Sequence, residues 1–129
     1  MDAETSLADV RDWVRQFVAA RDWEQFHSPK NLSMALAIEA AELMEHFQWL
    51  TVPASRTLAA DPAQRQAIGE EVADVFCYVL AMANELDLDL TTILHDKMAK
   101  NEQKYPASEY RGRFGPTDPG SGSSADPTG

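Results

Sequence analysis

Two short acidic pairs stand inside two stretches of sequence that are otherwise typical of buried helices. Glu39 and Glu42 lie in MALAIEAAELMEHFQWL, and Glu71 and Asp74 lie in IGEEVADVFCYVLAMANEL. Residues three apart share one face of a helix, so each stretch directs two carboxylates to the same side. Apolar residues flank both pairs, and taking an ion out of water costs several kcal/mol unless something compensates it. The chain therefore has to form helices that bring these acids to a compensating partner.

Four carboxylates in apolar surroundings favour a bound cation, and hard oxygen ligands favour Mg²⁺, with Mn²⁺ as a possible substitute. If the two helices run side by side, such ions turn the acids into a platform for a triphosphate. A fifth acid, Glu45 or Glu70, is then available to orient or deprotonate a water molecule. A single acidic pair is common on a solvated helix, so an exposed surface remains the alternative interpretation.

The chain is predicted to be all-α, a four-helix bundle. Ser6 with Asp9 is typical of a capping box, and Asp61-Pro62 is typical of a helix start. Pro29 is expected to keep RDWEQFHSPKN as a connector, with Asn31 or Ser33 capping the second helix. The predicted helices cover residues 7–21, 32–50, 62–86 and, after a cap at Asp87 or Asp89, the residues up to Pro106.

The composition sets the domain organisation. With 129 residues the chain is expected to form one domain, residues 1–112, followed by a tail, residues 113–129, that is disordered by its composition. Thr51-Val52-Pro53 is expected to end the second helix and to open a polar loop. Cys77, the only cysteine, stands among apolar neighbours and is interpreted as a packed, inert thiol.

The net charge of −10 argues against binding a nucleic-acid polymer, which needs clustered Lys and Arg. A small phosphorylated ligand is still compatible with an acidic chain, provided that metal ions reverse the local field. No apolar run is long enough to span a membrane, and the start MDAETSLADV has no secretion signal, so a cytoplasmic protein is expected.

Apolar residues occupy both sides of the acidic strip on the second predicted helix. Leu36 and Phe47 lie on one side, and Ile38 and Trp49 on the other. An ordinary surface helix has one apolar stripe and a broad polar back. Burial on two sides is most easily reached by oligomerisation, so a homo-oligomer is expected.

Two further clusters carry possible binding chemistry. Aromatic rings stack on nucleobases, and near the predicted helix ends stand Trp23, Phe26, His27 and Trp49, with Tyr78 on the third helix. Core packing, or for His27 a place at the surface, is the alternative for these residues. Cations in an acidic chain can bind phosphates, and here they are Lys97, Lys100 and Lys104, beside Asn101. A solvated helix end is the alternative for this cluster.

The same residues resemble a known family. Glu39-x-x-Glu42, then 28 residues, then Glu71-x-x-Asp74 is similar to the signature of the MazG-like all-α nucleotide pyrophosphohydrolases. The resemblance extends over about residues 5–110 and is closest to the dCTP pyrophosphatase branch. It rests also on RDWEQFHSPKNL, on Phe47-Gln48-Trp49, on the stretch from Glu70 to Tyr78, and on Lys97, Asn101 and Lys104-Tyr105-Pro106.

The resemblance implies a helical oligomer, a dimer or a tetramer, and Mg²⁺-dependent hydrolysis of a nucleoside triphosphate, most specifically dCTP or a modified dCTP, to monophosphate and pyrophosphate. It implies house-cleaning of the nucleotide pool. By this resemblance the metal ligands would be Glu39, Glu42, Glu71 and Asp74. The nucleoside pocket would be lined by Trp23, Trp49 and Tyr78. The phosphates would be held, or the pocket completed, by Lys97, Asn101, Lys104 and Tyr105. Val14 stands where some animal relatives have histidine, so a different base preference is an open alternative.

Two other classes of protein compete with this interpretation. A di-iron carboxylate bundle needs paired Glu-x-x-His motifs, and the sequence has that spacing only at Glu24 and His27. A non-enzymatic helical interaction module would instead present the acidic strips to a basic partner.

Overall fold

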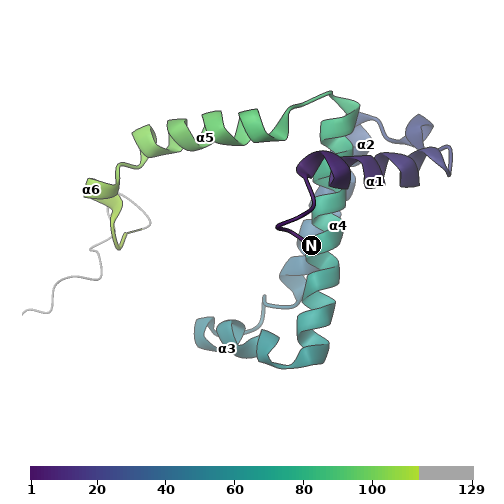
Figure 1. Cartoon of the computed structure of the whole chain (residues 1–129). Coiled ribbons are helices and arrows are strands. Elements are labelled where there is room, and N and C mark those ends of the chain that lie inside the picture. Colours follow the sequence, from purple (N-terminus) through teal and green to yellow (C-terminus); the bar gives the residue numbers. More distant parts are fainter. Residues whose placement is uncertain (114–129) are drawn as a thin grey trace, which may run out of the picture. The chain divides into compact units, whose positions relative to one another are not determined.

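The computed structural model describes residues 1–113, and within them it contains helices and turns but no strand. The all-α prediction is confirmed. The main helices are α1 (Leu7–Ala19), α2 (Pro29–Glu45), α4 (Pro62–Glu85) and α5 (Leu90–Lys104) (Figure 1). Shorter elements are α3 (Val52–Thr57), α6 (Ala107–Tyr110) and the 3₁₀ turns Glu24–Phe26 and Leu58–Ala60. The predicted tail, apart from Arg113, lies outside the described residues.

The chain divides into two compact units, Met1–Leu88 and Asp89–Gly129. In the first unit α4 is the central helix, because it packs along α2 and also against α1. The second unit holds α5 and α6. The division into a domain of residues 1–112 and a tail stays a prediction.

The predicted helix starts agree with the structure at three places. The Ser6 hydroxyl accepts a hydrogen bond from the Asp9 backbone N–H (3.2 Å), and the Asp9 carboxylate accepts one from Ser6 N (2.9 Å), which completes a capping box. Asp61 accepts from Ala63 N (2.9 Å) at the start of α4, and Asp89 accepts from Thr92 N (2.8 Å) at the start of α5. Each cap supplies a partner for a backbone N–H group that the first turn leaves without one.

The prediction for the second helix was wrong at both ends. The helix α2 begins at Pro29, because proline at the first helical position loses no intrahelical hydrogen bond, and Ser28 caps it by accepting from Asn31 N (3.2 Å). It ends at Glu45, after which the chain tightens into turns such as Leu50 N to Phe47 O (2.9 Å). The stretch 51–53 starts the short helix α3, where a polar loop was expected.

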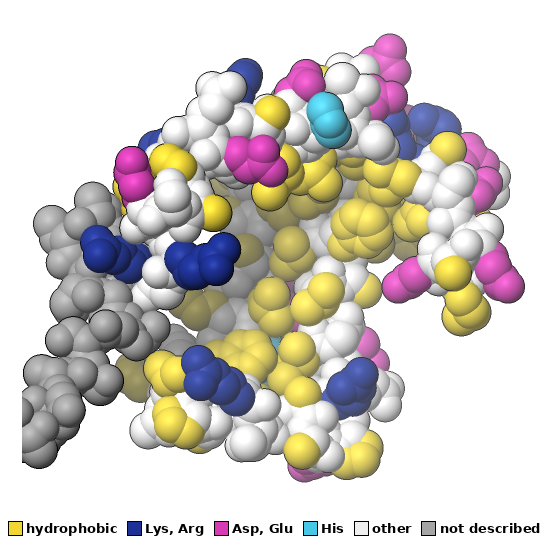
Figure 2. Space-filling view, turned by 60° about the vertical axis from the view of Figure 1, so that its left-hand side comes forward, with side chains coloured by type: hydrophobic (Ala, Val, Ile, Leu, Met, Phe, Trp, Pro, Cys, Tyr) yellow, Lys and Arg dark blue, Asp and Glu magenta, His cyan; other side chains and the backbone are white. Residues whose placement is uncertain are grey.

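Few side chains are buried in the described part of the chain. The buried hydrophobic residues are Val18, Leu32, Leu80, Ala81 and Ala83. Large apolar side chains remain open to solvent, including Trp13 (61% exposed), Ile38 (57%) and Trp49 (89%). The face drawn in Figure 2 carries many such hydrophobic side chains at its surface. None of the helices within residues 1–113 has the length and apolarity to cross a membrane.

Arg11 joins α1 to the C-terminal end of α4. Its guanidinium donates to the Asn84 side-chain oxygen (3.0 Å), the Leu88 carbonyl (2.8 Å) and the Ala83 carbonyl (3.2 Å), and the Asn84 amide donates back to the Arg11 carbonyl (3.0 Å). These bonds satisfy carbonyl groups at a helix end, where intrahelical donors run out. Arg11 thereby fixes the position of α1 along α4.

Candidate active site

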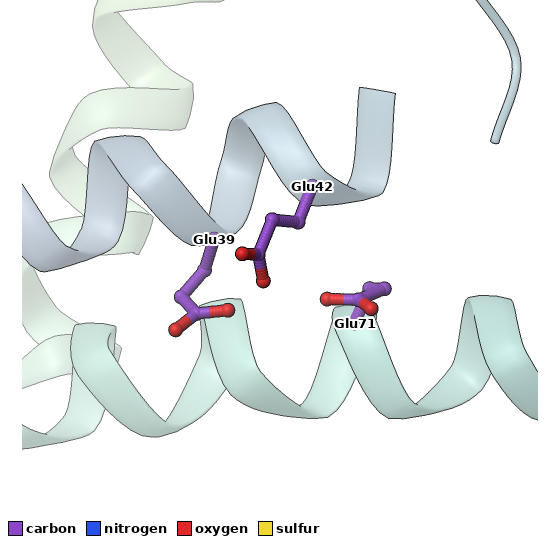
Figure 3. Close-up of side chains that lie close together, drawn as sticks. All are labelled: Glu39, Glu42 and Glu71. Atoms are coloured by element: carbon purple, nitrogen blue, oxygen red, sulfur yellow. The ribbon is translucent and has the colours of Figure 1, made fainter. Parts of the chain in front are cut away.

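Three of the four predicted metal-binding acids meet between α2 and α4. Glu39 and Glu42 lie one turn apart on α2, and Glu71 extends from α4 toward them (Figure 3). One carboxylate oxygen from each lies within 4.8 Å of the other two. The close packing of α2 along α4 brings together acids that are distant in sequence.

The electrostatics of this cluster are unfavourable without a partner. Partial burial, then a hydrogen bond and the charge from Glu42, then the charges of Asp74 and Glu71 raise the pKa of Glu39 above its usual range. The Oε2 atom of Glu71 is buried and has no hydrogen-bond partner. A buried carboxylate oxygen without a donor is costly, and a divalent cation is the group that satisfies several such oxygens at once. The residues present therefore fit a divalent ion.

Asp74 does not belong to this three-residue cluster. It lies one turn beyond Glu71 on α4, is exposed, and lines the pocket described next. Its charge nevertheless acts on Glu39 and Tyr78, because it contributes to the raised pKa of both. Asp74 thus stands where the acidic cluster meets the pocket.

An open pocket of about 580 Å³ lies between α1 and α4. Its polar groups come from His27, Asp74 and Tyr78, and Trp23 adds an indole ring. The remaining wall is mainly apolar: Val10, Trp13, Val14, Phe17, Val18, Ala73, Phe76, Cys77, Leu80 and Ala81. A mostly apolar concavity with a few polar groups is the usual form of a small-molecule site.

Tyr78 and Cys77 link the pocket to the acids electrostatically. Partial burial and the charges of Glu39 and Asp74 raise the pKa of Tyr78. Partial burial and Asp74 raise the pKa of Cys77. The interpretation of Cys77 as a packed thiol was wrong, because its side chain is exposed on the pocket side of α4 rather than in the small core.

The structure brings Trp23, His27 and Tyr78 to one pocket but leaves other predicted residues elsewhere. Trp49 is 89% exposed in the turns after α2. Glu45 is exposed, and Glu70 is exposed and accepts a hydrogen bond from the Gln66 amide (3.0 Å). Their proposed roles stay predictions.

The predicted phosphate-binding residues all lie in the second unit. Lys97, Asn101 and Lys104 are on α5, and Tyr105 follows it. The Lys104 ammonium lies 5.2 Å from the centre of the Tyr105 ring, and Tyr105 packs edge-to-face on Tyr110 with 5.3 Å between ring centres. These contacts order the end of α5 within its own unit.

Apart from Val14, the residues that α1 contributes to the pocket were not identified from the sequence. Val10, Trp13 and Phe17 line it as well. Two large aromatic residues on α1, near a connector that carries Trp23, were the signal that could have suggested a binding wall.

Comparison with known proteins places this geometry in a family. Residues 34–113 match the MazG-like family, a range that includes both acidic pairs and α5. The chain belongs to the MazG-like family. The structure is similar to a pyrophosphatase from Archaeoglobus fulgidus, with a TM-score of 0.70 and 34% identity over 78% of this chain and 92% of the other.

Within the MazG-like family the chain resembles the dCTP pyrophosphatase branch. It is 42% identical over 109 residues to dCTP pyrophosphatase 1 of Rattus norvegicus, which is 84% of this chain and 64% of the relative. It is 42% identical over 104 residues to dCTP pyrophosphatase 1 of Homo sapiens, which is 81% of this chain and 61% of the relative. The chain therefore spans less than two thirds of the length of these curated relatives.

Proposed function

We propose that this MazG-like chain hydrolyses a nucleoside triphosphate to its monophosphate and pyrophosphate with the help of a divalent metal ion. The preferred substrate is dCTP or a base-modified dCTP, and the reaction removes unwanted nucleotides from the pool. The names of its relatives, dCTP pyrophosphatase 1 and a pyrophosphatase, support this reaction class.

One observation carries the proposal. An acidic cluster with an unpartnered buried oxygen on Glu71 adjoins an aromatic pocket, and Asp74 stands at the junction of the two. A nucleotide has the same two-part chemistry, since its phosphates are anionic and its base is flat and weakly polar.

The side chains divide the work accordingly. Glu39, Glu42 and Glu71 would hold Mg²⁺ or Mn²⁺, with Asp74 as the fourth predicted ligand. A bound divalent ion supplies charge neutralisation for the triphosphate and lowers the pKa of water. Trp23, His27 and Tyr78 would hold the nucleoside, and the pocket that they line would keep bulk water from the base.

The remaining roles rest on the family resemblance. Glu45 or Glu70 would accept the proton of the attacking water. Lys97, Asn101, Lys104 and Tyr105 would contact the phosphates, and Trp49 would complete the base pocket. An acidic chain needs such cations to offset its own repulsion of a triphosphate.

A homodimer or homotetramer is part of the proposal. The small number of buried residues and the exposed side chains of Trp13, Ile38 and Trp49 support an oligomer, because a single copy leaves a large apolar surface in water. Light scattering coupled to size-exclusion chromatography measures this directly, and a monomer at micromolar concentration would refute it.

The reaction is tested by incubating the purified chain with Mg²⁺ and a panel of canonical and modified deoxynucleoside triphosphates. Chromatography should show dCMP and pyrophosphate from dCTP, and EDTA should stop the reaction. We also propose that water attacks the α-phosphorus and expels pyrophosphate. In ¹⁸O-labelled water the label should therefore enter the monophosphate. Release of dCDP and orthophosphate would refute the mechanism.

A further inference from the structure

The turn that carries Trp23 into the pocket is fixed by backbone hydrogen bonds. Trp23 N donates to Val18 O (3.1 Å), and Asp22 N donates to Ala19 O (3.0 Å). Asp22 has a φ of 53°, which is in the left-handed region that commonly ends a helix. The Gln25 amide donates to the Asp22 carbonyl (2.9 Å) and carboxylate (3.1 Å) and holds the turn from the other side.

The backbone alone does not fix the indole ring. Trp23 is 42% exposed and Phe17 is 50% exposed, so the protein encloses neither ring. The two rings meet edge-to-face, with 5.8 Å between their centres and 73° between their planes. Both line the apolar pocket.

Arg21 holds this aromatic pair from outside the pocket. Its guanidinium carbon lies 3.6 Å from the centre of the Phe17 ring and 5.8 Å from that of the Trp23 ring. Its Nη1 donates to the Phe17 carbonyl (3.0 Å), which lacks the usual helical donor because Arg21 N bonds Val18 O instead (3.2 Å). Arg21 itself is exposed and does not line the pocket.

We propose that Arg21 is a positioning residue that sets the strength of base binding by holding Phe17 and Trp23 in their stacking geometry. The guanidinium stacks on Phe17, and Phe17 in turn limits the rotation of the Trp23 indole. A ring that is already oriented loses less freedom when a base stacks on it, so binding is tighter. The inference rests on the proposed function, which assigns the pocket to the nucleoside.

The planar fork of arginine matters here as well as its charge. A lysine at this position keeps the positive charge but neither stacks as a flat group nor holds ring and carbonyl together. The alternative role for Arg21 is direct attraction of the triphosphate in an acidic chain, and it predicts that Lys would serve as well.

The test measures steady-state kinetics with dCTP for Arg21→Gln and Arg21→Lys, with Arg56→Gln as the matched control that removes one exposed charge from α3. Both Arg21 variants should raise KM by about three- to tenfold and change kcat by less than about twofold. Inhibition by inorganic pyrophosphate, which has no base, should be unchanged. In a Trp23→Ala background, Arg21→Gln should have almost no further effect on KM.

Three results would overturn the inference: an unchanged KM, a full KM effect that persists without Trp23, or weaker pyrophosphate inhibition in proportion to KM. A wild-type chain that cleaves no triphosphate defeats the proposed function instead. The positioning role is then tested by the fluorescence of Trp23 in a Trp13→Phe, Trp49→Phe chain. Arg21→Gln should shift that emission, and an unchanged spectrum overturns the inference.

Discussion

The two sides of α4 differ in their chemistry, since one carries acidic residues and the other carries apolar and aromatic residues. On the side facing α2, acids are gathered and partly buried, and Glu71 Oε2 has no hydrogen-bond partner. On the side facing α1, apolar and aromatic side chains surround an open pocket and stay exposed. The residues of the first side fit a cation, and those of the second fit a flat, mainly apolar ligand. A single nucleotide bound with a metal ion would occupy both, so neither side is expected to function alone.

The largest effect is expected on the acidic side. Glu71→Gln keeps the size of the side chain but removes the negative charge of the carboxylate, whose Oε2 atom has no hydrogen-bond partner. Loss of a group that only supports a metal ligand costs about 10–100-fold, so loss of the ligand itself should lower kcat by at least about 100-fold. Isothermal titration with Mn²⁺ should show the matching loss of metal binding.

Glu85→Gln is the matched control for Glu71→Gln, because it removes one exposed charge from the same helix. It should keep full activity. If Glu71→Gln retained more than a tenth of the wild-type kcat, Glu71 would not be a metal ligand. The assignment of metal binding to the side of α4 that faces α2 would then lose its main support.

A smaller effect of a different kind is expected on the pocket side. Trp23→Ala removes a stacking surface worth about 1–3 kcal/mol per base, which corresponds to a rise in KM of about 5- to 150-fold. Mn²⁺ affinity without nucleotide should stay at the wild-type value, since Trp23 is not one of the residues of the acidic cluster. Equal losses of metal and nucleotide binding would show that the two sides are one site and cannot be separated.

The smallest effect concerns stability without metal. The pKa of Glu39 is raised, so its charged form is disfavoured in the folded chain. This penalty is present above the folded-state pKa and disappears as the pH falls below the ordinary glutamate value. With EDTA present, Glu39→Gln should therefore raise the melting temperature at pH 7 and leave it nearly unchanged at pH 4.

Thermal unfolding between pH 4 and pH 8 measures this effect, and adding Mg²⁺ should reverse it in favour of the wild type. A wild-type chain that is more stable than Glu39→Gln at pH 7 in EDTA would mean that Glu39 has a favourable partner within the protein.

Each acidic pair could be recognised in the sequence because the spacing within a pair is local, whereas the approach of Glu71 to Glu39 and Glu42 depends on the packing of α2 along α4. The spacing of Glu39 with Glu42 specifies a shared helix face, and capping residues such as Ser6, Asp61 and Asp89 specify where helices begin. Asp74 lies outside the three-residue cluster, although its charge acts on Glu39, and its role as a fourth ligand stays a prediction.

Trp23, His27 and Tyr78 could be grouped from the sequence, but the wall that α1 adds to their pocket could not, because it depends on how α1 lies on α4. The hydrogen bonds of Arg11 to the end of α4 fix that placement, and they join residues more than 70 positions apart. The interpretation of Pro29 failed for a local reason, since proline breaks a helix interior but is accepted at its first position. The end of α2 at Glu45 was missed because apolar residues continue to Leu50 without a helix.

The most direct test is a crystal structure with Mn²⁺ and a dCTP analogue whose α,β-bridging oxygen is replaced by NH. Anomalous scattering should place Mn²⁺ within coordinating distance of Glu39, Glu42 and Glu71, with the base against Trp23 in the pocket between α1 and α4. Manganese bound elsewhere, with these three carboxylates turned to bulk solvent, would contradict the account.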